Sequence, residues 1–161
     1  MPAGMVTPDT GNRTRVPERP CPECGLDTRS VRGEDVAALL RENAAARRPV
    51  PERADVRERP APDVWSPPEY ACHARDVLRV FDGRLRPMLS EEGPSFPARD
   101  QDATALAERY GEQDPHRVAR EPEEAGESLA ARFATVTGEQ WRRTGDRSDG
   151  SRFTVETFAG T

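Results

Sequence analysis

The sequence predicts an all-α protein, an up-down bundle of three main helices with a short extra helix and a C-terminal helical stub. Two long segments, 66–89 and 114–136, each combine a helix-capping residue, a proline at the first helical position and apolar residues at helical spacing. A shorter segment, 34–48, repeats the apolar spacing and ends at prolines. We therefore expect three helices, each of which buries one apolar face.

The first helix is expected over about 34–48. Glu34 and Asp35 suit the positive end of a helix dipole, and Pro49 and Pro51 end the helical pattern. A Pro- and Arg-rich connector then runs to residue 62. The residues that fall on one apolar face of this helix are Val36, Leu39, Leu40 and Ala44.

The second helix has the clearest signal. Ser66 suits the N-cap, Pro67 the first helical position and Glu69 the third, which together form a capping box. The apolar stripe expected on this helix consists of Tyr70, Val77, Val80, Phe81, Leu85 and Met88, and the pattern ends near Leu89. The opposite side carries Arg75, Arg79 and Arg86, which we expect to form part of a solvated surface of mixed charge.

A loop at 93–97 and a short helix over about 102–110 precede the third main helix, for which Asp114 and Pro115 supply the cap and first position. Pro122 lies inside this helix, where a proline costs on the order of 3 kcal/mol or forces a kink. Thr137 and Gly138 close it. Its apolar face consists of Val118, Ala125, Leu129, Phe133 and Val136.

The last element is expected to begin after a turn at 148–150. Thr154 suits an N-cap, and Phe153 and Phe158 have the spacing of a hydrophobic staple around it. Two interpretations stay open for residues 153–161: a frayed C-terminal stub, or a chain that ends as its last helix begins.

Length and composition allow one core-poor domain. The 161 residues include only 25 Leu, Val, Ile and Phe, a share below the roughly 20% where disorder becomes common, yet the net charge of −5 is small. Residues 1–20 are expected to be flexible, 21–29 to form a C-x-x-C turn and 30–161 to form the bundle. Mixed acidic charge argues against nucleic-acid binding, and no apolar run suits a membrane span or signal peptide. We expect a cytoplasmic protein.

His73 is the first candidate ligand, because it lies within the apolar arc of the second helix. Its two alternatives are a buried histidine bonded to a neighbour and an imidazole metal ligand aimed into a bundle core. Asp76, three residues on, could then support the imidazole from behind. His116 is expected to be exposed without a role, so this chain alone cannot supply three histidines to one metal.

Cys21 and Cys24 have the spacing of one zinc knuckle. A full site needs two more ligands, and Cys72 is the one spare thiol. The alternatives are a Cys21/Cys24/Cys72 zinc site, a redox dithiol and a structural knuckle. The sequence contains no G-x-G-x-x-G, P-loop or G-x-S-x-G motif. It therefore gives no support to nucleotide binding, S-adenosylmethionine binding or serine-hydrolase activity.

Several segments together resemble DinB-like proteins of an actinobacterial branch. Residues 64–77 are similar to the W-S-x-x-E-Y-x-x-H-x-x-D segment of that family, and residues 100–105, 147–150 and 153–157 and the Cys-Pro-x-Cys-Gly start extend the likeness over about 21–159. The absence of lysine and isoleucine agrees with a GC-rich source.

The resemblance implies a four-helix bundle related to mycothiol-dependent maleylpyruvate isomerase and bacillithiol S-transferases. Intact relatives hold a divalent metal, such as zinc or nickel, with one histidine of the second helix and an H-x-x-x-H pair of the fourth, and use a low-molecular-weight thiol. His73 matches the first ligand. The chain departs from the family at Pro122, at Arg99 in place of a tryptophan, and after Ala159, where the histidine pair is missing.

The resemblance therefore implies a truncated, inactive homologue of metal-dependent thiol S-transferases with an incomplete bundle. One alternative is a non-catalytic helical module that binds a partner or forms a homodimer through an exposed apolar groove. That groove would be lined by Val36, Leu39, Leu40, Tyr70, Val77, Phe81, Leu129 and Phe133. The other alternative is a small zinc-knuckle protein that uses Cys21 and Cys24.

Overall fold

A computed structural model describes residues 19–20, 22, 25, 27–45 and 54–159 of the chain. The helices are α1 (Val36–Ala45), α2 (Pro67–Ser90), α3 (Gln101–Ala107), α4 (Pro115–Ala134) and α5 (Val155–Ala159), and the strands are β1 (Ser95–Phe96), β2 (Thr144–Arg147) and β3 (Arg152–Thr154). The predominantly helical fold confirms the predicted class. Most of the segment expected to be flexible, and Cys21 and Cys24, lie outside the described residues.

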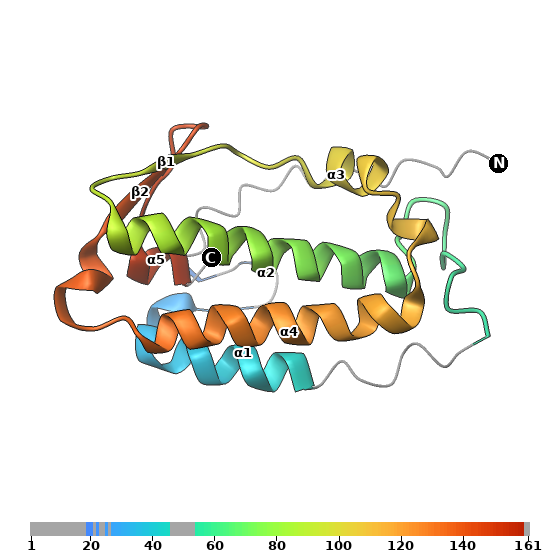
Figure 1. Cartoon of the computed structure of the whole chain (residues 1–161), viewed down its shortest axis with the longest axis horizontal. Coiled ribbons are helices and arrows are strands. Elements are labelled where there is room, and N and C mark those ends of the chain that lie inside the picture. The colour runs from blue at the N-terminus through green and yellow to red at the C-terminus, as the bar shows by residue number, and fades with distance from the viewer. Residues whose placement is uncertain (1–18, 21, 23–24, 26, 46–53, 160–161) are drawn as a thin grey trace.

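The two long helices α2 and α4 lie side by side, and α1 covers α4 from the other side (Figure 1). The chain crosses back over the length of α2 through β1 and α3 before it enters α4, so α2 and α4 run in the same direction. Directions therefore alternate between α1 and α2, as in an up-down bundle, but not between α2 and α4. None of the described helices is long and apolar enough to span a membrane.

The predicted helix starts are present. Ser66 and Glu69 form the capping box of α2, and the Asp114 carboxylate accepts a hydrogen bond from the backbone N–H of His116 at 2.9 Å. Pro122 is accommodated within one continuous helix, α4, with its ring buried. The short extra helix begins one residue earlier than expected, with Asp100 as its cap.

The core lies between α2, α4 and the C-terminal elements. Phe158 of α5 is 1% exposed and stacks on Phe81 of α2, with ring centroids 4.4 Å apart. The expected cap and staple of α5 are confirmed: Thr154 Oγ1 accepts from the backbone N–H of Thr157 at 3.1 Å, and the Phe153 and Phe158 rings are 6.0 Å apart. The core comprises Val36, Leu85, Met88, Phe96, Leu129, Phe133, Val136, Phe153, Val155 and Phe158.

Part of the expected apolar groove is covered. Leu129 and Phe133 are 2% and 3% exposed, because α1 and the C-terminal segment pack against α4. Leu39 and Tyr70, in contrast, were assigned to apolar faces and are 46% and 51% exposed. These two side chains of the expected groove are therefore exposed to solvent.

A small three-stranded sheet at one end of the bundle was not predicted. β1 pairs with β2 in parallel and β2 pairs with β3 in antiparallel register, and the turn at 148–150 joins the latter two with Gly150 at φ 90°. Gly145 of β2 packs so closely on the core that a Cβ there would lie 2.7 Å from Phe96 Cε1. The sheet places Arg147 beside α2, where it reaches the candidate site.

Candidate functional site

His73 lies in the second turn of α2 and lines a cavity of about 150 Å³. The apolar part of the lining comes from α2. Arg99 and Gln101 come from the segment that leads into α3, and Arg147 comes from the end of β2. The lining residues are His73, Val77, Val80, Phe81, Arg84, Arg99, Gln101 and Arg147. Three separate parts of the chain thus converge on this histidine.

The imidazole of His73 is held by packing rather than by hydrogen bonds. Its ring centroid lies 5.2 Å from that of Trp65, and its Nδ1 atom is buried with no hydrogen-bond partner among the described residues. Burial lowers the pKa of His73, and the positive charge of Arg99 lowers it further. The neutral imidazole is therefore the favoured form near pH 7.

Arginine side chains give the cavity a positive wall. Arg84 stacks over the Phe96 ring, with its guanidinium carbon 4.8 Å from the ring centroid, and donates a hydrogen bond to the Pro97 carbonyl at 2.7 Å. Burial lowers the pKa of Arg84, and the charges of Arg147 and Arg99 lower it further. In the described part of the chain, Arg84 forms no ion pair with a carboxylate. Like charges are thus held close together here, which costs free energy.

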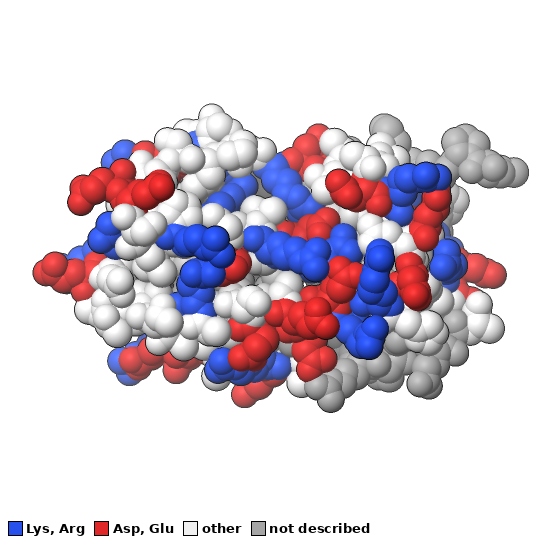
Figure 2. All heavy atoms as spheres, in the orientation of Figure 1, with Lys and Arg blue, Asp and Glu red and all other residues white. Residues whose placement is uncertain are grey.

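The other cationic side chains of the cavity have partners. Arg147 contacts the Asp149 carboxylate at 2.6 Å, and Arg99 donates to the Tyr110 hydroxyl at 3.0 Å and lies 3.5 Å from Asp76 Oδ2. Figure 2 shows that arginines cover much of this face of the molecule over α2, with acidic residues among them. Some of the arginines that were expected to be solvated are therefore held in place by hydrogen bonds and ion pairs.

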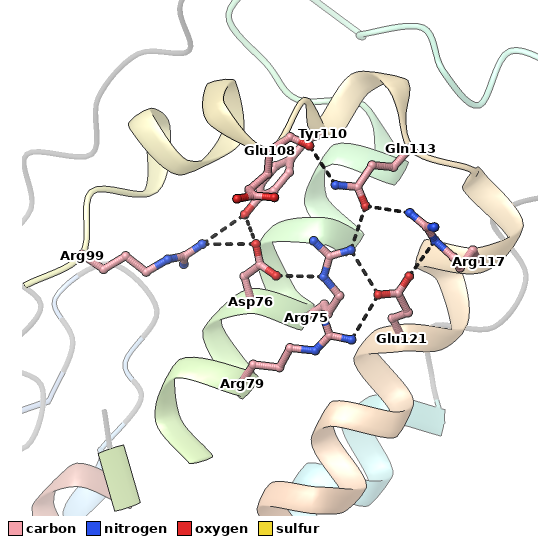
Figure 3. Close-up of polar contacts among 9 residues, drawn as sticks. All are labelled: Arg75, Asp76, Arg79, Arg99, Glu108, Tyr110, Gln113, Arg117 and Glu121. Atoms are coloured by element: carbon pink, nitrogen blue, oxygen red, sulfur yellow. Dashed lines mark hydrogen bonds and ion pairs between the residues drawn. The ribbon is translucent and has the colours of Figure 1, made fainter. Parts of the chain in front are cut away.

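Asp76 joins α2 to the segment before α4 (Figure 3). It accepts a hydrogen bond from Arg75 Nε at 2.8 Å and another from the Tyr110 hydroxyl. Burial alone would raise the pKa of Asp76, but the hydrogen bonds from Arg75 and Tyr110 and the charge of Arg99 hold it below its usual value. Asp76 is therefore an ionised anchor for Arg99 at the cavity edge.

Arg75 was predicted to lie on a solvated face, and that was wrong: it is only 5% exposed. Its Nη1 donates to Gln113 at 2.8 Å and to Glu121 of α4 at 3.2 Å (Figure 3). Arg79 and Arg117 also pair with Glu121. These arginines face another helix that carries acidic residues at matching positions. The pattern of a single helix does not reveal such a partner, so the sequence analysis missed it.

Among the residues that the structure describes, the other candidates do not bond to the His73 imidazole. Asp76 lies close enough for its charge to favour protonated His73, but it makes no hydrogen bond to this imidazole. Cys72 is fully buried against Tyr110 and Val118, and burial raises the pKa of its thiol to about 11. In the absence of a metal ion it therefore stays protonated near pH 7. His116 is exposed, as expected.

The described residues do not fit a divalent metal at His73. They contain no group of three or more His, Cys, Asp or Glu side chains arranged to hold a metal ion. Three guanidinium groups share the cavity instead, and these are always charged and have no lone pair to donate. The unpaired Nδ1 is a possible single donor, but a stable site needs further ligands.

Arg84 is a functional candidate that the sequence reasoning missed. At about 100° per residue, positions 73 and 84 lie within about 20° of each other on one helix, so the helical pattern itself placed this arginine on the face of His73. Arg99 had been noted only as a departure from the family, and Arg147 only as the first residue of segment 147–150, which resembles it. Their convergence depends on the unpredicted sheet.

Comparisons with known proteins agree with this architecture. A family model described as the DinB superfamily matches residues 48–161. A solved structure of YfiT from Bacillus subtilis, described as a probable metal-dependent hydrolase with an unusual four-helix bundle topology, superposes with a TM-score of 0.67 at 18% identity. The match covers 99% of this chain and 84% of YfiT. The search of curated proteins gave no match.

Proposed function

The chain belongs to the DinB superfamily, and we propose that it is a homologue of metal-dependent thiol S-transferases that does not carry out this reaction. The single observation that supports the proposal is the setting of His73. The imidazole expected to be the first metal ligand shares its cavity with Arg84, Arg99 and Arg147 rather than with other metal-binding side chains.

The electrostatics of the cavity work against a cation. A divalent ion beside His73 would face the positive charge of Arg84, which forms no ion pair among the described residues, and that of Arg99, which lies 3.5 Å from Asp76 Oδ2. Like charges repel at such a partly buried site, and one imidazole supplies too few ligands to offset that repulsion. The cavity therefore lacks the set of ligands that would hold a metal able to lower the pKa of a thiol.

Metal binding tests the proposal directly. The 161-residue protein would be dialysed against zinc or nickel, passed through a desalting column and measured by inductively coupled plasma mass spectrometry, in parallel with His73→Ala. We expect equal metal content in the two proteins. One equivalent of metal that disappears in His73→Ala would overturn the proposal.

A matched variant separates the second metal hypothesis. Zinc that is retained in His73→Ala but lost in Cys21→Ser would identify a zinc knuckle, which leaves the interpretation of the His73 cavity unchanged. The accompanying activity assay measures conjugation of a low-molecular-weight thiol to an aryl halide with zinc or nickel present. We expect the rate to equal that without protein, and a metal-dependent rate lost in His73→Ala would contradict the proposal.

A further inference from the structure

The His73 cavity has two chemically different walls. Val77, Val80 and Phe81 provide hydrocarbon from α2, whereas polar residues line the remainder: His73, Arg84, Arg99, Gln101 and Arg147. Ligand sites typically pair such an apolar surface with a few polar groups that fix orientation. The cavity volume of about 150 Å³ suits a small molecule rather than a peptide or nucleotide.

Among the described residues, one arginine of the positive wall forms no ion pair with a carboxylate. Arg147 is neutralised by Asp149, and Arg99 shares Asp76 with Arg75. Arg84, in contrast, contacts a backbone carbonyl and an aromatic ring, and its pKa is lowered by burial and by the other two arginines, with only a smaller opposing effect from Asp149. An anion placed here would relieve this repulsion and accept charge-assisted hydrogen bonds.

We propose that this cavity binds a small organic anion, whose carboxylate or phosphate head contacts Arg84, Arg99 and Arg147 and whose short hydrocarbon part lies against Val77, Val80 and Phe81. The planar guanidinium fork matches the oxygens of either head group. Neutral His73 lines the cavity beside the aromatic ring of Trp65. It adds a hydrogen-bonding group that carries no negative charge to repel the anion.

This inference goes beyond the proposed function and does not depend on it, because the anion site needs no metal. The test is isothermal titration calorimetry on the full chain in EDTA at low ionic strength. Hexanoate, hexyl phosphate and hexanamide share a six-carbon body and differ in the head group, and inorganic phosphate supplies a head group without that body.

We expect either hexanoate or hexyl phosphate to bind at one equivalent, at least tenfold more tightly than hexanamide and than inorganic phosphate. The better anion identifies the head group. Binding of hexanamide that equals both anions would overturn the proposal, as would an absence of binding by both. Stronger binding of inorganic phosphate than of hexyl phosphate would show that the apolar wall does not contact the ligand, and would overturn that part of the proposal.

Variants on one helix locate the site. Arg84→Gln removes the unpaired guanidinium and is expected to weaken binding of the preferred anion about tenfold or more. Arg86→Gln is the matched control, since Arg86 is exposed on the same helix and does not line the cavity. Equal affinity in Arg84→Gln and the wild type would overturn the assignment, provided that circular dichroism shows both proteins to be folded.

Discussion

Substitution of Asp76 by Asn tests whether the polar network between α2 and the start of α4 stabilises the fold. The change keeps the side-chain shape but removes the negative charge that faces Arg75, Arg99 and Tyr110. The Asp76 and Arg75 side chains are only 16% and 7% exposed. Removing one partner of a buried ion pair typically costs about 3–5 kcal/mol. Because Glu121 still contacts Arg75, we expect about 3 kcal/mol, the lower end of that range.

Urea unfolding followed by circular dichroism measures this loss, which corresponds to a fall in Tm of roughly 6–12 °C for a chain of this size. Asp146→Asn is the control, because its pair with Arg152 is solvent-exposed and contributes at most about 1 kcal/mol. Asp76 has a lowered pKa, so its contribution is complete above its ordinary pKa of 3.8 and is lost as the pH falls through its lower value in the folded protein.

The reasoning would be refuted if Asp76→Asn and Asp146→Asn lost the same free energy of unfolding. A double-mutant cycle with Tyr110→Phe adds a second criterion. Since the Tyr110 hydroxyl donates to Asp76 and accepts from Arg99, the two changes should couple by about 0.5–3 kcal/mol. Strict additivity would show that the observed hydrogen bond carries no energy.

Three further predictions concern His73, the core and the sheet. Burial and Arg99 disfavour protonated His73, so stability is expected to fall as the pH drops below 6.5 toward the lower folded pKa; thermal melts between about pH 7 and about pH 5 should show a smaller slope in His73→Gln than in the wild type, and equal slopes would contradict the burial of this imidazole. Phe158→Ala should cost about 3–5 kcal/mol in urea unfolding, whereas exposed Glu156→Ala should stay within about 0.5 kcal/mol; equal losses would contradict the packing of α5. Gly145→Ala should cost about 1–3 kcal/mol of stability by overpacking against Phe96 and Met88. Gly83→Ala, with open space around its Cβ position, should instead stabilise α2 by about 0.5–1 kcal/mol in the same assay. Effects of the opposite sign would contradict the close packing of β2.

The local signals in the sequence predicted the helices well. Ser66 with Glu69, Asp114 with Pro115, and Thr154 with its phenylalanine staple act over a few residues, so their structural effect is visible in the chain itself. Strands β1 to β3 were missed because each is short and is stabilised by partners that are distant in sequence. Local patterns do not contain those partners.

The site was predicted only in part for the same reason. His73 was identified from the pattern of α2 and lines the cavity, while its role as a ligand stays a prediction. The meaning of its surroundings depends on Arg99 and Arg147, which the return segment and the sheet bring to α2. Arg75 shows the same limit, because its burial is explained by Glu121 of a different helix.

The most direct test of the account is the response of His73 to zinc, observed by NMR at the imidazole Cε1 proton in the His116→Gln protein at about pH 7.5. Binding of zinc by Cys21 and Cys24 would leave this signal in place. We predict that the resonance keeps its position and width at one equivalent of zinc and moves on addition of the preferred organic anion. A zinc-dependent shift that saturates at one equivalent would contradict the central claim that arginines make this cavity a site for anions rather than for a metal.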